Sequence, residues 1–279
     1  MQNKEKAMFD YHIHSNLSFD AYDSPVRCAM AARDKGLTEI CMTEHHELDY
    51  PYNETNCELD FSFYDMEIIK AREVVPEIIV RKGVEVSLRP AVLKRTQESI
   101  KGRGFDFIIA SQHTIKEKDP YFGDGFEGKT LREAQREYLE EMLYDLQNFD
   151  DYDVIGHIGY IDKYLEKAAG LTGGGGPFTY ADFHELLDEI LRTAISKGKG
   201  IEVNTSNYFV YDYPTPHPSI IKRFAELGGE VMTMGSDAHF SDAIGHRFRD
   251  AVQLMKQCGV KYVCTFEQRK PSFIPLEEL

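Results

Sequence analysis

Short apolar runs alternate along the chain with longer segments whose apolar residues recur at helical spacing. The apolar runs predict strands over residues 9–14, 39–43, 78–86, 105–110, 154–158, 200–204 and 231–234, and a short last strand over 262–265. The longer segments predict helices over residues 25–36, 63–75, 130–148, 180–196, 219–227 and 243–258. Ser24 followed by Pro25 is typical of a helix start. The alternation predicts right-handed βαβ units and a parallel sheet.

Seven such units favour an α/β fold of one type, a closed but distorted TIM-like (β/α)7 barrel, over an open doubly wound sheet. No GxGxxG or GxxxxGK[ST] motif follows a predicted strand, which argues against dinucleotide-binding and P-loop proteins. The chain has 279 residues, of which 42% are hydrophobic, and no linker or repeat divides it. We therefore expect a single barrel domain over residues 1–279, with the glycine run at 173–176 as a surface loop.

Metal-binding side chains stand where the predicted strands end. They are His12, His14, His45, Glu85, His113, His157, Asp237 and His239. Because the carboxyl ends of barrel strands converge on one site, we expect these side chains to meet. Imidazole and carboxylate without thiolate suit zinc, manganese or iron, and eight ligands are too many for one ion. The pattern predicts two or three divalent metal ions.

Spacing within these segments adds detail. Residues two apart in a strand share a face, so His12 and His14 should point the same way, as should Asp237 and His239. For the same reason only one of the neighbours His45 and His46 can face inward.

Charge and cysteine content narrow the class of protein. The formal net charge is -15, which argues against nucleic acid as a partner. The five cysteines are odd in number and show no CxxC spacing, so neither a disulfide framework nor a thiolate zinc site is expected. No signal peptide is visible, and no apolar stretch approaches the roughly 20 residues of a membrane span. We expect a soluble, cytoplasmic protein without a membrane partner, either a monomer or a small homo-oligomer.

The motifs DYHIHS, TEHH, GVEV, SQH, GHIGYIDKY, IEVNTS and GSDAH resemble those of the polymerase-and-histidinol-phosphatase (PHP) superfamily. The resemblance runs from about residue 9 to residue 271 and is greatest to the monofunctional histidinol-phosphate phosphatases. It implies a metal-dependent phosphomonoester hydrolase that acts on a small phosphorylated substrate, L-histidinol phosphate, and releases L-histidinol in histidine biosynthesis. A hydroxide shared by two metal ions would be the nucleophile.

The resemblance also implies how three metals share their ligands. The first would be held by His12, His14, Glu85 and Asp237, the second by Glu85, His113 and His157, and the third by Asp20, His45 and His239. Spacing alone would leave Asp20 as a solvated loop carboxylate. Either Asp20 or His239 could deliver a proton to the leaving alkoxide.

The sequence indicates the residues that contact the substrate less clearly than it indicates the metal ligands. The related phosphatases often carry a basic residue shortly after the segment that corresponds to Asn204-Thr205-Ser206, whereas this chain has no Lys or Arg there before Lys222. Arg89 and Arg247 are the candidates to replace it. Ser206 and His217 are further candidate substrate contacts, although His217, between two prolines, also fits a turn.

Three other functions share parts of this pattern. An amidohydrolase would typically carry a bridging lysine where this chain has Glu85. A phosphodiesterase or exonuclease of the same superfamily would be expected to carry a basic stripe. A non-catalytic metal-binding protein would be expected to have lost some of the ligands, whereas all nine are present.

Overall fold

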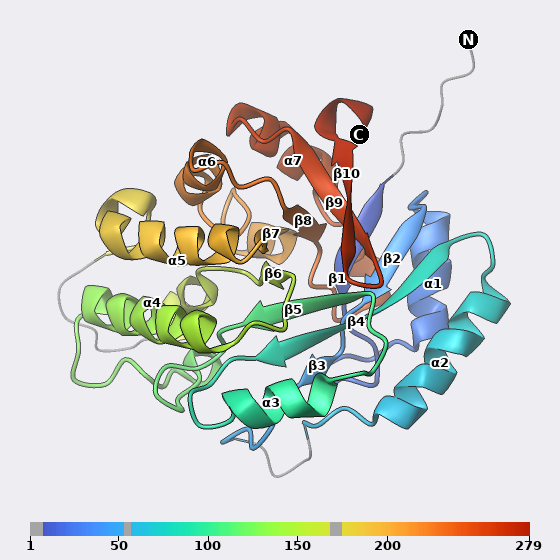
Figure 1. Cartoon of the computed structure of the whole chain (residues 1–279), viewed down its shortest axis with the longest axis horizontal. Helices are drawn as coiled ribbons and strands as arrows, with labels where there is room; N and C mark the ends of the chain where they lie inside the picture. Colours follow the sequence, from blue (N-terminus) through green and yellow to red (C-terminus); the bar gives the residue numbers. More distant parts are fainter. Residues whose placement is uncertain (1–7, 53–56, 168–174) are drawn as a thin grey trace.

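The computed structural model describes residues 8–52, 57–167 and 175–279, so part of the glycine run at 173–176 lies outside the described residues. Within these ranges seven parallel strands form a sheet that curls into a nearly closed barrel (Figure 1). In sheet order they are β1 (Phe9–Ile13), β2 (Glu39–Met42), β4 (Ile79–Ser87), β5 (Phe107–Ser111), β6 (Val154–Ile155), β7 (Gly200–Asn204) and β8 (Met232–Gly235). A parallel bridge between Ile13 and Ala238 joins the first strand to the end of the last. The prediction of a distorted (β/α)7 barrel is confirmed.

Helices surround the sheet and bury its outer face (Figure 1). They are α1 (Pro25–Asp34), α2 (Phe61–Val74), α3 (Leu93–Ile100), α4 (Leu131–Asn148), α5 (His184–Ser196), α6 (Pro218–Glu226) and α7 (Phe248–Gln257). Local sequence explains several boundaries: Ser24 caps α1, and Thr130 and Glu133 form a capping box at the start of α4. None of the described helices is long and apolar enough to cross a bilayer.

Among the longer described elements, α3 and the second strand of a C-terminal hairpin were not anticipated from the sequence. The short helix α3 has few apolar residues and no side-chain cap, so its sequence carries a weak helix signal. At the other end of the chain, β9 (Tyr262–Glu267) and β10 (Lys270–Pro275) form an antiparallel hairpin where only one short strand is predicted. Pro271 and Pro275 lack backbone N–H groups, and both are tolerated because β10 lies at the edge of its two-stranded sheet.

The β9–β10 hairpin covers one end of the barrel. This end is opposite to the one where the strand ends carry histidines. The hydroxyl of Tyr11, on β1, accepts a hydrogen bond of 2.7 Å from the backbone N–H of Phe266 and also contacts the buried carboxylate of Glu39. The rings of Tyr11, Phe107 and Phe266 pack together beneath it. This end of the barrel is therefore filled by side chains, and the opposite end is left for chemistry.

Glycines make room at the functional end of the barrel. A Cβ atom at Gly235, the last residue of β8, would overlap the side chains of His12 and Glu202. A Cβ atom at Gly156, just after β6, would overlap the hydroxyl of Ser111. The space that these two glycines leave is occupied by side chains of neighbouring strands.

Replacing Gly235 with alanine should therefore lower the free energy of unfolding by about 1–3 kcal/mol, because the added methyl group overpacks the barrel interior. Urea denaturation measures the change. Gly176→Ala is the matched control, since a Cβ atom there meets nothing within 4 Å. Equal unfolding free energies for the two variants would contradict this account.

Candidate metal centre

Four side chains from three strand ends meet at the centre of the barrel mouth. His12 and His14 face the same way from β1, and their Nε2 atoms lie 3.0 Å apart. Oε2 of Glu85, on β4, is 3.3 Å from Nε2 of His12 and 3.4 Å from Nε2 of His14. Oδ1 of Asp237 is 3.6 Å and 3.4 Å from the same two nitrogens.

A second group shares the carboxylate of Glu85. Its other oxygen, Oε1, is 2.9 Å from Nε2 of His157 and 3.3 Å from Nε2 of His113. The two imidazole nitrogens are 3.4 Å apart. Glu85 therefore turns one oxygen toward each group, which is the geometry of a bridging carboxylate.

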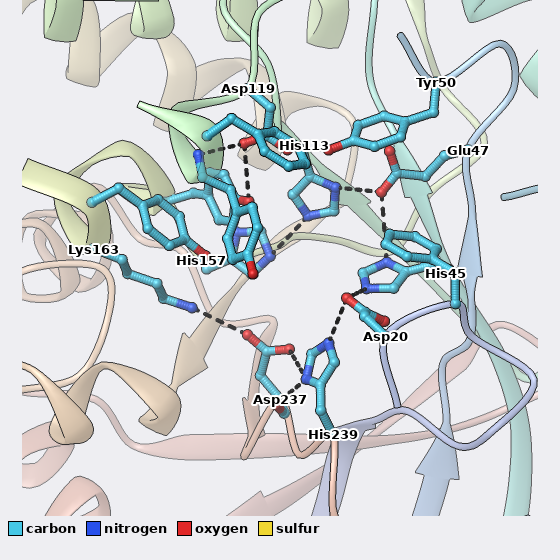
Figure 2. A pocket seen from close by; sticks show the side chains of 15 residues that line it. Asp20, His45, Glu47, Tyr50, His113, Asp119, His157, Lys163, Asp237 and His239 are labelled. Carbon is cyan, nitrogen blue, oxygen red and sulfur yellow. Dashed lines mark hydrogen bonds and ion pairs between the residues drawn. The ribbon is translucent and has the colours of Figure 1, made fainter. Parts of the chain in front are cut away.

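A third group lies at the rim, where Asp20 and His239 meet His45 (Figure 2). Oδ2 of Asp20 is 3.6 Å from Nε2 of His45 and 3.3 Å from Nε2 of His239. His45 belongs to β3 (His45–His46), whose pairing with β4 places His45 directly beside Glu85. The neighbour His46 faces away and bonds the hydroxyl of Ser99 at 2.8 Å. All nine residues expected at the metals thus lie together.

The donor set fits several divalent cations. Within the described ranges, four groups of three His, Asp or Glu side chains have ligand atoms within 4.8 Å of one another, and every member belongs to these nine residues. Oε2 of Glu85 is buried and lies 2.9–3.4 Å from nitrogens of His12, His14 and His45 without a well-directed hydrogen bond to any of them. Converging lone pairs of this kind are costly to bury unless a cation binds them. This arrangement of ligand atoms confirms the expectation of two or three divalent metal ions.

Buried carboxylates hold the histidines from behind. Oε1 of Glu202, on β7, is 2.5 Å from Nδ1 of His12, and Oε1 of Glu47 is 2.8 Å from Nδ1 of His113. Each contact places the Nδ1 proton toward the carboxylate and leaves Nε2 free to bind a metal. Sequence reasoning assigned no role to Glu202 or Glu47. For Glu202 the available signal was a charged residue between the apolar Ile201 and Val203 of a predicted strand.

The same groups set the protonation of the histidines. Burial lowers the pKa of His14 well below its usual value, so its ring is neutral and ready to bind a cation. Burial also lowers the pKa of His12, but the carboxylates of Glu202, Glu85 and Asp237 outweigh it and raise this pKa well above the usual value. A cation that binds His12 must therefore displace a proton, and acidification should weaken metal binding.

The residues that follow β8, the last strand of the barrel, do not continue the strand as we expected. We expected Asp237 and His239 to share the face of a strand, but β8 ends at Gly235 and Asp237 has a left-handed backbone with φ of 54°. The backbone N–H of Asp237 donates to the carbonyl of His12 at 2.8 Å. The contact with β1, rather than strand geometry, brings Asp237 to the site.

Above the metal-ligand cluster lies a cavity of about 470 Å³ (Figure 2). Its wall is largely aromatic and includes Phe19, Tyr50, Tyr121, Phe122, Tyr160 and Tyr164. Three charged side chains outside the cluster also line it, Lys163, Asp119 and Glu47. Nζ of Lys163 is 3.1 Å from Oδ2 of Asp237 and 2.8 Å from Oγ of Ser206. Neither Lys163 nor Asp119 was anticipated, although Lys163 lies within the GHIGYIDKY motif.

None of the four candidate substrate contacts is among the residues that line this cavity. Arg89 is 1% exposed and turns its guanidinium to Glu117 and to backbone carbonyls. Arg247 is exposed, pairs with Asp250 and stacks on Tyr208. His217 caps α6 and accepts from the N–H of Ser219. Of the four candidates only Ser206 reaches the site, through Lys163 and through a contact of 3.2 Å with Asp237.

A PHP domain model matches residues 10–206. The chain belongs to the PHP family. It is 32% identical to the histidinol-phosphatase of Lactococcus lactis over 94% of this chain and 95% of that protein. The crystal structure of the Lactococcus lactis histidinol phosphate phosphatase, complexed with zinc, L-histidinol and phosphate, matches with a TM-score of 0.80 over 95% of this chain and 98% of that one. A structure from Listeria monocytogenes, 18% identical, has a TM-score of 0.69 over 87% of this chain and 99% of that one, and shows the shared fold.

Glu202→Gln should weaken zinc binding by about 10–100-fold, because the neutral amide no longer holds the proton of His12 Nδ1 as the carboxylate does. Competition with a chelator of known affinity measures the change. Glu189→Gln, an exchange of the same type on the outer helix α5, should leave zinc affinity unchanged. Equal zinc affinities for the wild type and the Glu202 variant would count against the orienting role.

Proposed function

We propose that this PHP family member is a metal-dependent phosphatase that hydrolyses L-histidinol phosphate to L-histidinol and phosphate. One observation carries the proposal: a cavity whose floor is the metal-ligand cluster has a partly buried cation on one side and a buried carboxylate on another. The floor and the cation suit a phosphate monoester, and the carboxylate suits a positively charged alcohol. The relative from Lactococcus lactis, solved with L-histidinol and phosphate, supports this substrate.

The proposal assigns the ligands to three metal ions. The first would be held by His12, His14, Glu85 and Asp237, the second by Glu85, His113 and His157, and the third by Asp20, His45 and His239. Bound there, divalent cations would lower the pKa of a water molecule and neutralise charge on the phosphoryl oxygens. The protein contributes rigid donors on strand ends, so the ligands need little rearrangement to bind cations.

Lys163 is the cation that we assign to the substrate phosphate. Its side chain is 12% exposed, and its ammonium group lies beside Asp237 at the edge of the cluster. A phosphoryl oxygen bound over the floor could accept a hydrogen bond from this ammonium group. Ser206 holds Lys163 in place through its hydroxyl oxygen. Lys163 thus replaces the basic residue that is missing after Ser206.

Asp119 is the group that we assign to the leaving alcohol. The residue is 2% exposed. Its carboxylate accepts hydrogen bonds from Tyr50 and from the N–H of Tyr121, and lies 3.3 Å from the hydroxyl of Tyr160. Burial raises the pKa of this carboxyl above its usual value, although the Tyr50 hydroxyl opposes the shift. A buried carboxylate is stabilised by an incoming cation, and aromatic walls favour cations as well. L-histidinol carries an ammonium group and an imidazole that match this wall.

Asp20 and His239 complete the proposed chemistry. Both line the cavity, and Asp20 Oδ2 and His239 Nε2 are 3.3 Å apart at its rim. We assign to one of them the delivery of a proton to the leaving alkoxide. The proposal also includes action in the cytoplasm as a monomer or small homo-oligomer, with no nucleic acid or membrane partner.

A phosphatase screen with added zinc or manganese tests the proposal. We expect kcat/KM for histidinol phosphate to exceed that for glycerol phosphate by about 100-fold, since a site built for a cation discriminates against a neutral alcohol. His12→Ala combined with His14→Ala should abolish both metal binding and turnover, whereas His184→Ala, on the outer helix α5, should not. Full activity of the double variant, or selective cleavage of diesters, would overturn the proposal.

Variants of Asp119 and Lys163 distinguish recognition of the alcohol from recognition of the phosphate. Asp119→Asn should raise KM for histidinol phosphate about 10-fold or more and leave glycerol phosphate unaffected, because only the cationic alcohol loses its partner. Lys163→Met should lower kcat/KM for both substrates by about 100-fold, because both share the phosphate. Steady-state kinetics measure the effects, with the exposed Lys222→Met as control. If Asp119→Asn impaired both substrates equally, the assignment to the alcohol would be wrong.

A further inference from the structure

Behind the cavity wall that carries Asp119, two loops meet on one buried guanidinium group. Arg89 follows β4 and lies four residues after Glu85, and only 1% of it is exposed. Its Nη2 donates to the backbone carbonyls of Leu48 and, at 2.9 Å, of Asp49. Its Nη1 forms an ion pair with the carboxylate of Glu117. One side chain thus holds two segments that are far apart in the sequence.

Both segments bear residues of the cavity. The first follows β3 and carries Glu47 and Tyr50, and the second follows β5 and carries His113 and Asp119. On the cavity side they touch again, where the hydroxyl of Tyr50 donates to the carboxylate of Asp119. Several contacts therefore join the two loops. Arg89 links them at the back, and the Tyr50–Asp119 pair, the Glu47–His113 contact and a hydrogen bond from the N–H of Asp119 to the hydroxyl of Tyr52 link them on the cavity side.

The loops adopt backbone conformations that need support. Asp49, Lys116 and Glu117 have φ values of 52°, 50° and 64°, a left-handed region that L-residues with side chains disfavour. Lys116 and Glu117 form the tip of a turn closed by backbone hydrogen bonds between Ile115 and Lys118. Two of these three left-handed residues, Asp49 and Glu117, are direct partners of Arg89.

A guanidinium group suits this task better than an ammonium group. Its planar fork presents several donors in fixed directions, so it can bind two carbonyls and a carboxylate at once. No described contact links Arg89 to the metal ligands, and Arg89 does not line the cavity. Its influence on the reaction must therefore pass through the two loops.

We propose that Arg89 is a positioning residue that sets the separation of the two loops and thereby the selectivity for the leaving alcohol. The inference rests on the proposed function, because it assigns Asp119 to that alcohol. It places the control of substrate choice on a residue outside the cavity. Glu47 and His113 lie at the bases of the two loops, within two residues of the ends of β3 and β5, so the strands rather than Arg89 hold the phosphoryl half of the site.

Arg89→Met tests the proposal in the zinc-loaded enzyme. We expect KM for histidinol phosphate to rise about 10-fold or more, while kcat/KM for p-nitrophenyl phosphate changes less than about 3-fold and zinc content is unchanged. Arg89→Lys should restore only part of the loss, because an ammonium group lacks the fork. The matched control is Arg95→Met, since Arg95 also contacts Asp49, but from the surface and through the carboxylate alone. The control should behave as the wild type.

Glu117→Gln provides a second variant in which Arg89 keeps its carbonyl contacts. It should raise KM for histidinol phosphate in the same direction but less, and it decides the question if Arg89→Met does not fold. Equal losses for both substrates, loss of zinc, or unchanged kinetics would each overturn the proposal.

Hydrogen–deuterium exchange separates failure of this inference from failure of the proposed function. If the wild-type enzyme shows no preference for histidinol phosphate, the proposed function fails whatever Arg89 does. Arg89→Met should still speed amide exchange in residues 47–52 and 113–122, where Arg95→Met should not. Unchanged exchange in both segments would overturn the loop-positioning role itself.

Discussion

The buried carboxylate of Glu85 is the group on which the rest of the site depends. Its two oxygens lie 2.9–3.4 Å from nitrogens of five imidazole rings, those of His12, His14, His45, His113 and His157. Burial raises the pKa of Glu85, but the histidines outweigh it and hold this pKa well below its usual value. An ionised carboxylate in the middle of the barrel can be stable only if positive charge surrounds it. Bound cations supply that positive charge. The centre of this end of the barrel is therefore occupied by charged and metal-binding side chains rather than by apolar ones.

The contacts that close the barrel also place metal ligands. The backbone N–H of His14 donates to the carbonyl of Ala238, and that of Asp237 donates to the carbonyl of His12, so that the ends of β1 and β8 join through the ligand-bearing segments. The buried carboxylate of Asp10 binds the backbone N–H of Ser236 and of Gly245 and fixes the turn that follows β8. Because these contacts join the first and last strands of the sheet, a change in closure would move the first metal's proposed ligands.

Strand ends were predictable from the sequence because their position follows from local rules. Alternation of apolar runs and helical segments predicted the barrel, and the position of His113 or His157 at a strand end was enough to place it at the mouth. Residues placed by contacts across the fold were not predictable in this way. Asp237 was predicted at the cluster, but the left-handed conformation that brings it there was not, and neither was Glu202, which acts from behind His12. Asp119 lies in a loop, and the conformation of that loop, which the sequence pattern does not predict, turns Asp119 toward the cavity.

Lys163 shows that a motif can lack its usual basic residue while another segment supplies a positive charge at the same place. The expected cation would follow β7, whereas Lys163 comes from the 3-10 helix Tyr160–Lys167, which follows β6. Adjacent strands of a barrel end side by side, so loops from either one can reach the same point above the metals. The contact of 2.8 Å between Lys163 and Ser206 joins these two segments directly. Electrostatic stabilisation of a phosphate depends on where the charge lies and not on which loop supplies it. The barrel therefore places the metal ligands, with the exception of Asp20, at or just after strand ends. It leaves the cation, like the residues that face the alcohol, free to come from different loops.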